Sequence, residues 1–398
     1  MKNFFTLICI VLLTSCNYAQ KDKTDTEGLI YFQDDNGKYG LKDHSGKIIS
    51  MADNFWGDAS YPKSFSEGLA SVELNGKSGY IDTAWQVIIP LKFSLAASFS
   101  DGLAMVRIDN GKRGYINRKG EFIIQPIYGF TNGFSDGLAR VAINNKWGFI
   151  DRTGKVIVEL KYDFADDFSE GMAWIQVGNK YGYIDKTGEL VIPLDYYDEV
   201  KSFSEGMAVI KQNDKKGFID KDGKMVVKPI YDDANDFYHG LASIEKDGKK
   251  GFVNKTGTVI IPLTYDKSSS FYSGTAQVSV DKKWGIIDTT GKEIIPLKYE
   301  DIQDFSEGIV PVQLNGKWGI VNEKEENIVP FIYDNTDSFY EGFASINLDG
   351  KCGYIDKIGK VVIPLQYDYC YLFQNGKAEV KLKKTKLYVD KTGKESRH

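Results

Sequence analysis

The chain has 398 residues, with 50 Lys and Arg against 55 Asp and Glu, so its formal net charge is −5. Acidic and basic residues are interspersed without a basic stripe, which argues against a nucleic-acid partner. Length alone would favour two or three globular domains. The sequence repeats itself with a fixed period, however, and this points to a single array.

The first twenty residues predict export. An apolar run over residues 4–13 is too short for a helix that spans a bilayer core of about 30 Å, and it fits the core of a secretory signal. The run ends in the letters LTSC, which resemble the lipobox of bacterial lipoproteins, where a Leu and small residues precede a Cys. The resemblance implies that residues 1–15 are a lipoprotein signal peptide, that Cys16 receives a lipid, and that residues 16–27 form a flexible tether. The alternative is an ordinary signal peptide that is cut after Ala19.

Residues 28–393 repeat one phrase about eleven times, and we interpret them as one tandem array followed by a tail at residues 394–398. A Gly of the phrase recurs at intervals of 34 or 35 residues, apart from a first interval of 39. Its copies are Gly40, Gly79, Gly114, Gly148, Gly182, Gly217, Gly251, Gly285, Gly319 and Gly353. A second phrase, FSEG in its full form, keeps the same period. A fixed period of roughly 20 to 50 residues is the signature of a solenoid, a propeller or another array.

Each repeat predicts three strands and leaves room for a short fourth. After FSEG, runs such as LASVEL from Leu69 place small or branched apolar residues at every second position, which indicates a strand buried on one face. A link rich in Asn, Asp and Gly predicts a hairpin to a second strand, KWGFID, with both faces covered. That strand ends in a turn from Asp151 to Gly154, where the Asp can accept from backbone amides and Gly supplies a positive φ. A third strand such as VIIP is expected to stop at its Pro, because proline removes a ladder donor.

The fold class is therefore all-β, since no stretch shows the sustained 3.6-residue apolar pattern of a helix. A small meander cannot bury two faces alone, so neighbouring repeats must cover each other. We expect antiparallel β-meander repeats of 34 or 35 residues, stacked as blade-like units in a curved or superhelical array. A many-bladed closed β-propeller is the alternative, although propellers typically have about 4 to 8 blades.

The sequence offers little catalytic or metal-binding chemistry. The three histidines, His44, His239 and His398, lie far apart at different positions of the repeat, so neither a His-based triad nor a zinc site has its spacing. A column of acidic residues beside the Gly of FSEG could present carboxylates for calcium or for glycoside hydrolysis. Its members are Glu67, Asp101, Asp136, Glu170, Glu205, Glu307 and Glu341. Because the acid recurs in nearly every repeat, we interpret it as part of a turn and expect no catalytic residue, no metal and no cofactor.

The Trp-Gly pair at the centre of the phrase is interpreted as structural. The residue before the Gly is aromatic in some copies and a long cation, Ser or Cys in others, which suits a half-exposed position that covers a neighbour. The Gly is nearly constant, which suggests that a side chain there would hit an adjacent strand or the Phe of the next repeat. The structural positions are Trp147, Gly148, Asp151, Gly154, Trp284, Gly285, Trp318 and Gly319. A ligand-stacking role for the three tryptophans is the alternative.

Three other tryptophans break the repeat pattern and are the candidate binding residues. Trp56 lies in the loop that lengthens the first interval, Trp85 lies in a turn that elsewhere has Gly, and Trp174 occupies a variable strand position. Each of them could equally pack locally. Cys352 stands where other copies have Trp, Tyr, Lys or Arg, and it either pairs with Cys370 in an oxidising compartment or stays free.

The signature Lys-Trp-Gly-x-Ile-Asp-x-x-Gly-Lys, followed by Val-Ile-Pro, Tyr-Asp and Phe-x-Glu-Gly-x-Ala, resembles the bacterial WG-repeat proteins, also called KWG repeats. The resemblance covers about 365 of the 398 residues. It implies a protein without established enzymatic activity and, together with the lipobox, a lipid-anchored place in a Gram-negative cell envelope, at the outer membrane. We expect a scaffold that binds another protein of the envelope. The alternatives are glycan or peptidoglycan binding through exposed aromatics and, third, a carboxylate-dependent hydrolase.

Overall fold

The computed structural model describes residues 29–34, 38–51, 64–195, 197–305, 308–374, 376–383 and 385–396. The signal segment, Cys16, the tether, Trp56 and Glu307 lie outside these residues. The chain divides into two compact units, Met1–Phe164 and Ala165–His398, which we call the N-terminal and the C-terminal unit. Each is described by itself.

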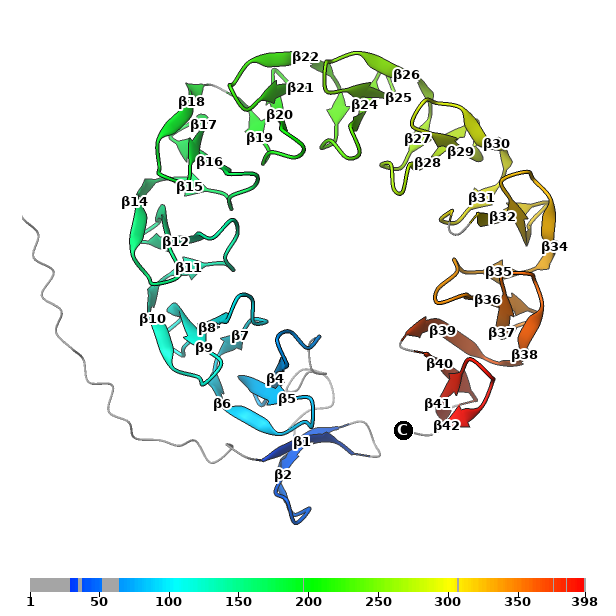
Figure 1. The fold of residues 1–398 in the computed structure, drawn as a ribbon, viewed down its shortest axis with the longest axis horizontal. Helices are drawn as coiled ribbons and strands as arrows, with labels where there is room; N and C mark the ends of the chain where they lie inside the picture. The colour runs from blue at the N-terminus through cyan, green and yellow to red at the C-terminus, as the bar shows by residue number, and fades with distance from the viewer. Residues whose placement is uncertain are drawn as a thin grey trace, which may run out of the picture. The chain divides into compact units, whose positions relative to one another are not determined.

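Both units consist of small antiparallel sheets that follow one another in chain order (Figure 1). The strands of the N-terminal unit, sheet by sheet, are β1 (Ile30–Gln33), β2 (Tyr39–Lys42) and β3 (Ile48–Met51); β4 (Leu69–Leu74), β5 (Lys77–Asp82) and β6 (Val87–Phe93); β7 (Leu95–Ala96), β8 (Leu103–Arg107), β9 (Arg113–Asn117) and β10 (Phe122–Tyr128); β11 (Phe130–Thr131), β12 (Ala139–Ile143), β13 (Lys146–Ile150) and β14 (Val156–Tyr162).

The sheets that follow in the chain all have four strands within the described residues. They are β15 (Phe164–Ala165), β16 (Met172–Val177), β17 (Lys180–Asp185) and β18 (Leu190–Asp195); β19 (Glu199–Val200), β20 (Met207–Gln212), β21 (Lys215–Asp220) and β22 (Met225–Tyr231); β23 (Asp233–Ala234), β24 (Leu241–Lys246), β25 (Lys249–Asn254) and β26 (Val259–Tyr265); β27 (Lys267–Ser268), β28 (Thr275–Val280), β29 (Lys283–Asp288) and β30 (Glu293–Tyr299); β31 (Asp301–Ile302), β32 (Ile309–Leu314), β33 (Lys317–Asn322) and β34 (Asn327–Tyr333); β35 (Asn335–Thr336), β36 (Phe343–Leu348), β37 (Lys351–Asp356) and β38 (Val361–Tyr367); β39 (Tyr369–Gln374), β40 (Lys377–Leu382), β41 (Thr385–Asp390) and β42 (Glu395–Ser396).

The sheet of β11 to β14 shows the anatomy of one repeat. The two-residue strand β11 pairs with β12, β12 forms a hairpin with β13, and β14 closes the meander. The hairpin turns at Asn144 and Asn145, whose φ angles of 50° and 60° match the right-handed twist of the strands. The short fourth strand for which the sequence leaves room is present. It lies just before the FSEG turn and pairs with the strand after that turn, so it is the first strand of the next sheet and not the last strand of the preceding one.

The expected stop of the third strand at its Pro is wrong. Strand β6 runs through Pro90 to Phe93. In its pairing with β5, Tyr80 faces Ile89 while Ser78 faces Phe93, so Pro90 lies in a bulge. Because β6 is the outermost strand of its sheet, a proline in its bulge removes no ladder hydrogen bond.

The hydrophobic core lies between successive repeats and not within one sheet. The aromatic residue after the Gly packs against the Phe of the following FSEG turn, as Tyr80 does against Phe99 with ring centroids 4.8 Å apart. The same contact joins Phe218 to Phe237 at 4.9 Å in the C-terminal unit. Each sheet thus depends on its neighbour for burial, as expected of a repeat array.

The prediction of an all-β chain built from tandem meander repeats is confirmed. The described residues contain no helix, and accordingly none that is long and apolar enough to cross a membrane. Cys352 and Cys370 form a disulfide with their Cα atoms 6.0 Å apart, which links β37 to the first strand of the next sheet.

Candidate functional site

The residue before the Gly fastens its own sheet to the first strand of the next one. The partner lies 17 or 18 residues further along the chain, but the chemistry of the contact differs between repeats. Trp147 packs against Phe164 with ring centroids 4.9 Å apart, and Arg113 lies over the ring of Phe130 at 4.5 Å.

Two other copies use charge and covalent chemistry at the same place. The Lys216 ammonium pairs with the Asp233 carboxylate at 2.7 Å, and Cys352 forms the disulfide to Cys370. Among the tryptophans, Trp318 is 4% exposed, whereas Trp147 and Trp284 are half-buried. The Trp position therefore serves packing between repeats and offers little free ring surface to a ligand.

The Gly of the pair lies against the backbone of the outermost strand of its own sheet, which for Gly148 is β14. A Cβ on Gly148 would overlap the carbonyl oxygen of Val158 and lie 2.7 Å from the carbonyl carbon of Glu159. For a Cβ on Gly285 or Gly319, the nearest atom is again a carbonyl oxygen of the outermost strand, at 2.5 and 2.8 Å. Of the two obstacles that the sequence suggests, the adjacent strand is the one that a side chain would meet.

The Asp after the second strand organises its own turn. One oxygen of Asp151 accepts hydrogen bonds from the amide of Thr153 at 2.8 Å, from the Thr153 hydroxyl at 2.6 Å and from the amide of Lys155 at 3.0 Å. The Thr153 hydroxyl is the main reason that the pKa of the Asp151 carboxyl is lowered. In another repeat Asn254 accepts the equivalent bonds from its turn, so the position needs an oxygen and not a charge.

The pattern-breaking tryptophans are held by local partners. Trp85 is half-buried, adopts a φ of 64° and stacks against Tyr31 of the first sheet at 6.2 Å. Trp174 is also half-buried and donates from its indole nitrogen to the Asp166 carboxylate at 3.0 Å. Trp56 lies outside the described residues. The two described candidates thus belong to different units, and each is packed within its own unit.

The acidic column forms a ladder between successive FSEG turns, which we call the turn ladder. The Glu205 carboxylate accepts from the amides of His239 and Gly240 at 2.7 and 2.8 Å, and Lys255 pairs with it at 3.0 Å. Burial raises the pKa of Glu205, but the hydrogen bonds from Lys255 and the two amides outweigh it and leave the pKa lowered. The Ser of the turn adds a second link, since the Ser204 hydroxyl donates to the Phe237 carbonyl at 2.8 Å.

Glu170 accepts in the same way from the amides of Glu205 and Gly206, and Lys221 lies 3.3 Å from it. Glu67 and Glu341 also bond to the following turn, since their carboxylates accept from the amides of Gly102 and Gly376. The Asp101 carboxylate pairs with Arg152. Among the described residues, no group of three or more His, Cys, Asp and Glu could hold a metal ion.

The turn ladder is interrupted at two consecutive turns. Here FSEG is replaced by FYHG from Phe237 and by FYSG from Phe271. Beside these turns lies a hollow of about 540 Å³, into which the sequence had not placed a site. Its lining residues are Ser204, Asn235, Asp236, Phe237, Tyr238, Ser270, Phe271 and Tyr272. The signal in the sequence that could have found it is the loss of both the Ser and the acidic residue from one turn, at Tyr238 and His239 and again at Tyr272 and Ser273.

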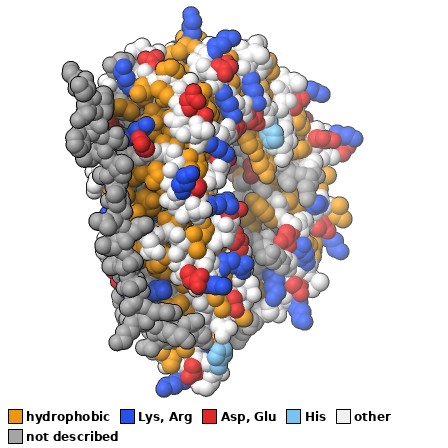
Figure 2. All heavy atoms as spheres, turned by 60° about the vertical axis from the view of Figure 1, so that its left-hand side comes forward, with side chains coloured by type: hydrophobic (Ala, Val, Ile, Leu, Met, Phe, Trp, Pro, Cys, Tyr) orange, Lys and Arg blue, Asp and Glu red, His pale blue; other side chains and the backbone are white. Residues whose placement is uncertain are grey.

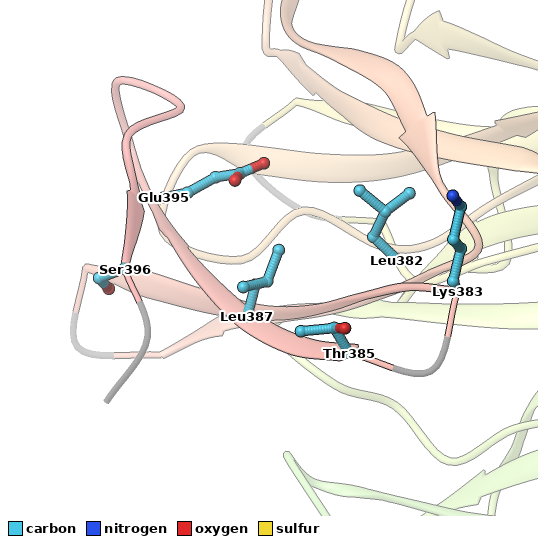
Figure 3. A pocket seen from close by; sticks show the side chains of 6 residues that line it. All are labelled: Leu382, Lys383, Thr385, Leu387, Glu395 and Ser396. Atoms are coloured by element: carbon cyan, nitrogen blue, oxygen red, sulfur yellow. The ribbon is translucent and has the colours of Figure 1, made fainter.

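A second hollow, of about 420 Å³, lies at the last sheet. Figure 3 shows Leu382, Leu387 and Glu395 around it, with Lys383, Thr385 and Ser396 completing the lining. In earlier repeats the residue at the position of Leu387 is the Gly of the pair. The hollow is thus a feature of the worn final copy.

The strand that the sequence predicts as the third of each repeat is the outermost strand of its sheet, and in most repeats it bears exposed apolar side chains. Figure 2 shows hydrophobic side chains exposed together over part of the surface, with Lys, Arg, Asp and Glu around them. The exposed apolar residues on these outermost strands are Ile48, Ile49, Ile88, Ile123, Ile127 and Val156 in the N-terminal unit, and Leu190, Val191, Met225, Ile230, Val259, Ile260, Ile332 and Val361 in the C-terminal unit. We call these residues the outer row.

Comparison with solved structures gives only distant likenesses. A eukaryotic initiation factor is 11% identical with a TM-score of 0.44, over 76% of this chain and 95% of that one. The extracellular domain of a putative hybrid two-component system from B. thetaiotaomicron is 10% identical with a TM-score of 0.26, over 93% of this chain and 64% of that one. BamB from Moraxella catarrhalis is 12% identical with a TM-score of 0.27, over 74% and 95%. These low scores support no functional argument.

The repeats themselves decide the family. No curated protein matches the chain significantly. The family model of the WG containing repeat matches nine consecutive segments, residues 79–112, 114–147, 147–181, 181–215, 217–249, 251–284, 284–318, 318–352 and 353–385. The matches run over the same meanders whose contacts are described above, an all-β tandem architecture that fits a scaffold. The chain therefore belongs to the WG containing repeat family.

Proposed function

We propose that this protein is a scaffold of the cell envelope that binds another protein through its outer row and has no catalytic activity of its own. The observation behind the proposal is the outer row itself. Single exposed apolar residues are ordinary, but apolar side chains that are exposed together in a patch mark an interaction surface. Ile127 and Ile230, for example, are 52% and 47% exposed.

The form of the edge indicates how a partner would bind. A bare edge strand invites another strand to pair with it. In most third strands a Pro interrupts the pattern of amides, as Pro262 does in β26, and the bulge twists the edge. We therefore propose that the partner contacts side chains of the outer row and does not extend the sheets.

Site-directed photocrosslinking in the native envelope tests this binding. A photoreactive phenylalanine analogue at Ile230 should give a discrete crosslinked protein that mass spectrometry identifies. The same analogue at Lys246, an exposed strand end of the following sheet outside the outer row, serves as the matched control. Recovery of lipid alone at Ile230, or equal crosslinking at Lys246, would refute the proposal.

We also propose that a lipid on Cys16 anchors the protein at the outer membrane. More than one acyl chain holds a soluble domain stably on a bilayer, whereas a single chain gives only marginal binding. Metabolic labelling with a radioactive fatty acid should mark the wild-type protein, and Cys16→Ala should abolish both the label and sedimentation with the outer membrane. An unlabelled wild-type protein would exclude the anchor.

A further inference from the structure

We infer that the two interrupted turns, 237–240 and 271–274, form a binding site for a neutral saccharide chain. The inference is independent of the protein partner proposed above, because it rests on the turns and their hollow and uses no residue of the outer row. It begins with the residues that the turn ladder loses here.

Three ladder residues are replaced together. Where other turns have Glu, these have His239 and Ser273, neither of which offers a carboxylate to the next turn. The cations that pair with the ladder acids lie 50 or 51 residues further on, as Lys255 does for Glu205. At the positions that correspond to His239 and Ser273, the chain has Thr289 and Glu323 instead.

The Ser that donates to the next Phe carbonyl is also replaced, by Tyr238 and Tyr272. A Ser hydroxyl sits close to the backbone, whereas a Tyr hydroxyl lies at the far end of a ring. The two rings are 46% and 70% exposed, although their neighbours Phe237 and Phe271 are buried. Two adjacent turns therefore lack the hydrogen bonds that join other repeats and have exposed aromatic rings in their place. Positions where a sequence departs from its own local pattern are typically functional sites.

The chemistry of the hollow suits a neutral saccharide. Exposed tyrosine rings provide flat apolar faces for the C–H faces of sugar rings, and their hydroxyls provide polar contacts. Asn235 donates to the Ser243 hydroxyl at 2.8 Å through its amide nitrogen, which fixes the orientation of its side chain at the hollow. The Asp236 carboxylate lies 3.7 Å from the Lys201 ammonium, so the charge at the site is largely balanced. A concave site with aromatic walls and a few oriented polar groups is the usual form of a small-ligand site.

A peptide fits this place less well. The backbone groups at the two ends of each turn already bond to each other, since the amide of Tyr238 donates to the Leu241 carbonyl at 2.9 Å and the amide of Leu241 donates to the Tyr238 carbonyl at 3.3 Å. Tyr272 and Thr275 exchange the same pair of bonds at 2.8 and 3.0 Å. Peptides that bind by strand addition need free backbone groups. Side-chain rings and hydroxyls are what these turns offer.

Isothermal titration of the purified protein with chitohexaose, cellohexaose, xylohexaose and maltohexaose tests the site. At least one should bind saturably with a Kd of about 1 mM or below. Tyr272→Ala should weaken that binding about tenfold, whereas Tyr272→Phe should retain most of it because the ring face remains. Tyr340→Ala is the matched control, since Tyr340 is an exposed Tyr in a turn that keeps its ladder acid, Glu341.

Rebuilding the ladder gives a second arm. The double variant Tyr238→Ser with His239→Glu should abolish saccharide binding while the protein remains folded by circular dichroism. Failure of all four hexasaccharides to saturate, or an equal loss in Tyr340→Ala, would overturn the inference. So would a Tyr272→Ala variant that binds saccharide normally but loses the crosslink at Ile230, because the turns would then serve the protein partner.

Discussion

Replacing Gly148 with Ala should destabilise its repeat by about 3 kcal/mol, near the upper end of what overpacking costs. The added methyl would lie 2.7 Å from both carbonyl atoms of Glu159, with the Val158 oxygen closer still. All of these are backbone atoms of β14, so no flexible side chain can move aside. The strand itself must shift, and with it the contact between Trp147 and Phe164 that joins this sheet to the next strand.

Native-state hydrogen exchange is the appropriate assay, because a repeat array opens locally and a single unfolding free energy is poorly defined for it. A loss of about 3 kcal/mol should speed the exchange of amides in β13 and β14 by about a hundredfold. Gly133→Ala is the matched control, since a methyl there meets no atom within 4 Å and its φ is not positive. That variant should stay within about 0.5 kcal/mol of the wild type. Equal exchange in the two variants would refute the backbone-contact explanation of the constant Gly.

Reduction of the bond between Cys352 and Cys370, which closes a loop with a sequence separation of 18, should cost about 3 kcal/mol and speed amide exchange in the last two sheets; unchanged exchange would contradict this. In a double-mutant cycle of Lys216→Trp and Asp233→Phe, each single change should destabilise and the pair should recover about 1 kcal/mol, because the two aromatics can pack as in the N-terminal unit. Strict additivity in the hydrogen exchange of the β21 amides would count against a shared fastening role. Asp151→Asn should leave the urea midpoint at pH 7 nearly unchanged. The pKa of the Asp151 carboxyl is lowered in the folded state. The stabilisation that the ionised carboxylate provides is therefore present above the unfolded-state pKa of about 3.9 and is lost as the pH falls through the folded-state pKa. The Asn variant should accordingly lose less stability than the wild type between pH 5 and about pH 2.

The sequence by itself determined the repeat, its strands and its turns, because these depend on local chemistry. Alternation of more and less buried residues defines a strand over five or six positions, as in β8, and an Asn or Asp with a nearby Gly defines the turn that follows. These patterns recur in ten copies, so a worn member such as Leu387 does not obscure them. Family membership followed from the same local patterns.

The tertiary structure decided what the repeated residues do for one another. Pro90 marks a bulge in an edge strand and not its end, which the sequence could not show because the neighbour of the strand was unknown. The partner of Trp147 and the acceptor role of Glu205 likewise depend on how adjacent sheets are set against each other. Those contacts join residues 17 or about 35 positions apart, where periodicity shows that a residue recurs but not which atom it meets. The interrupted turns became a candidate site only when the ladder they interrupt was visible.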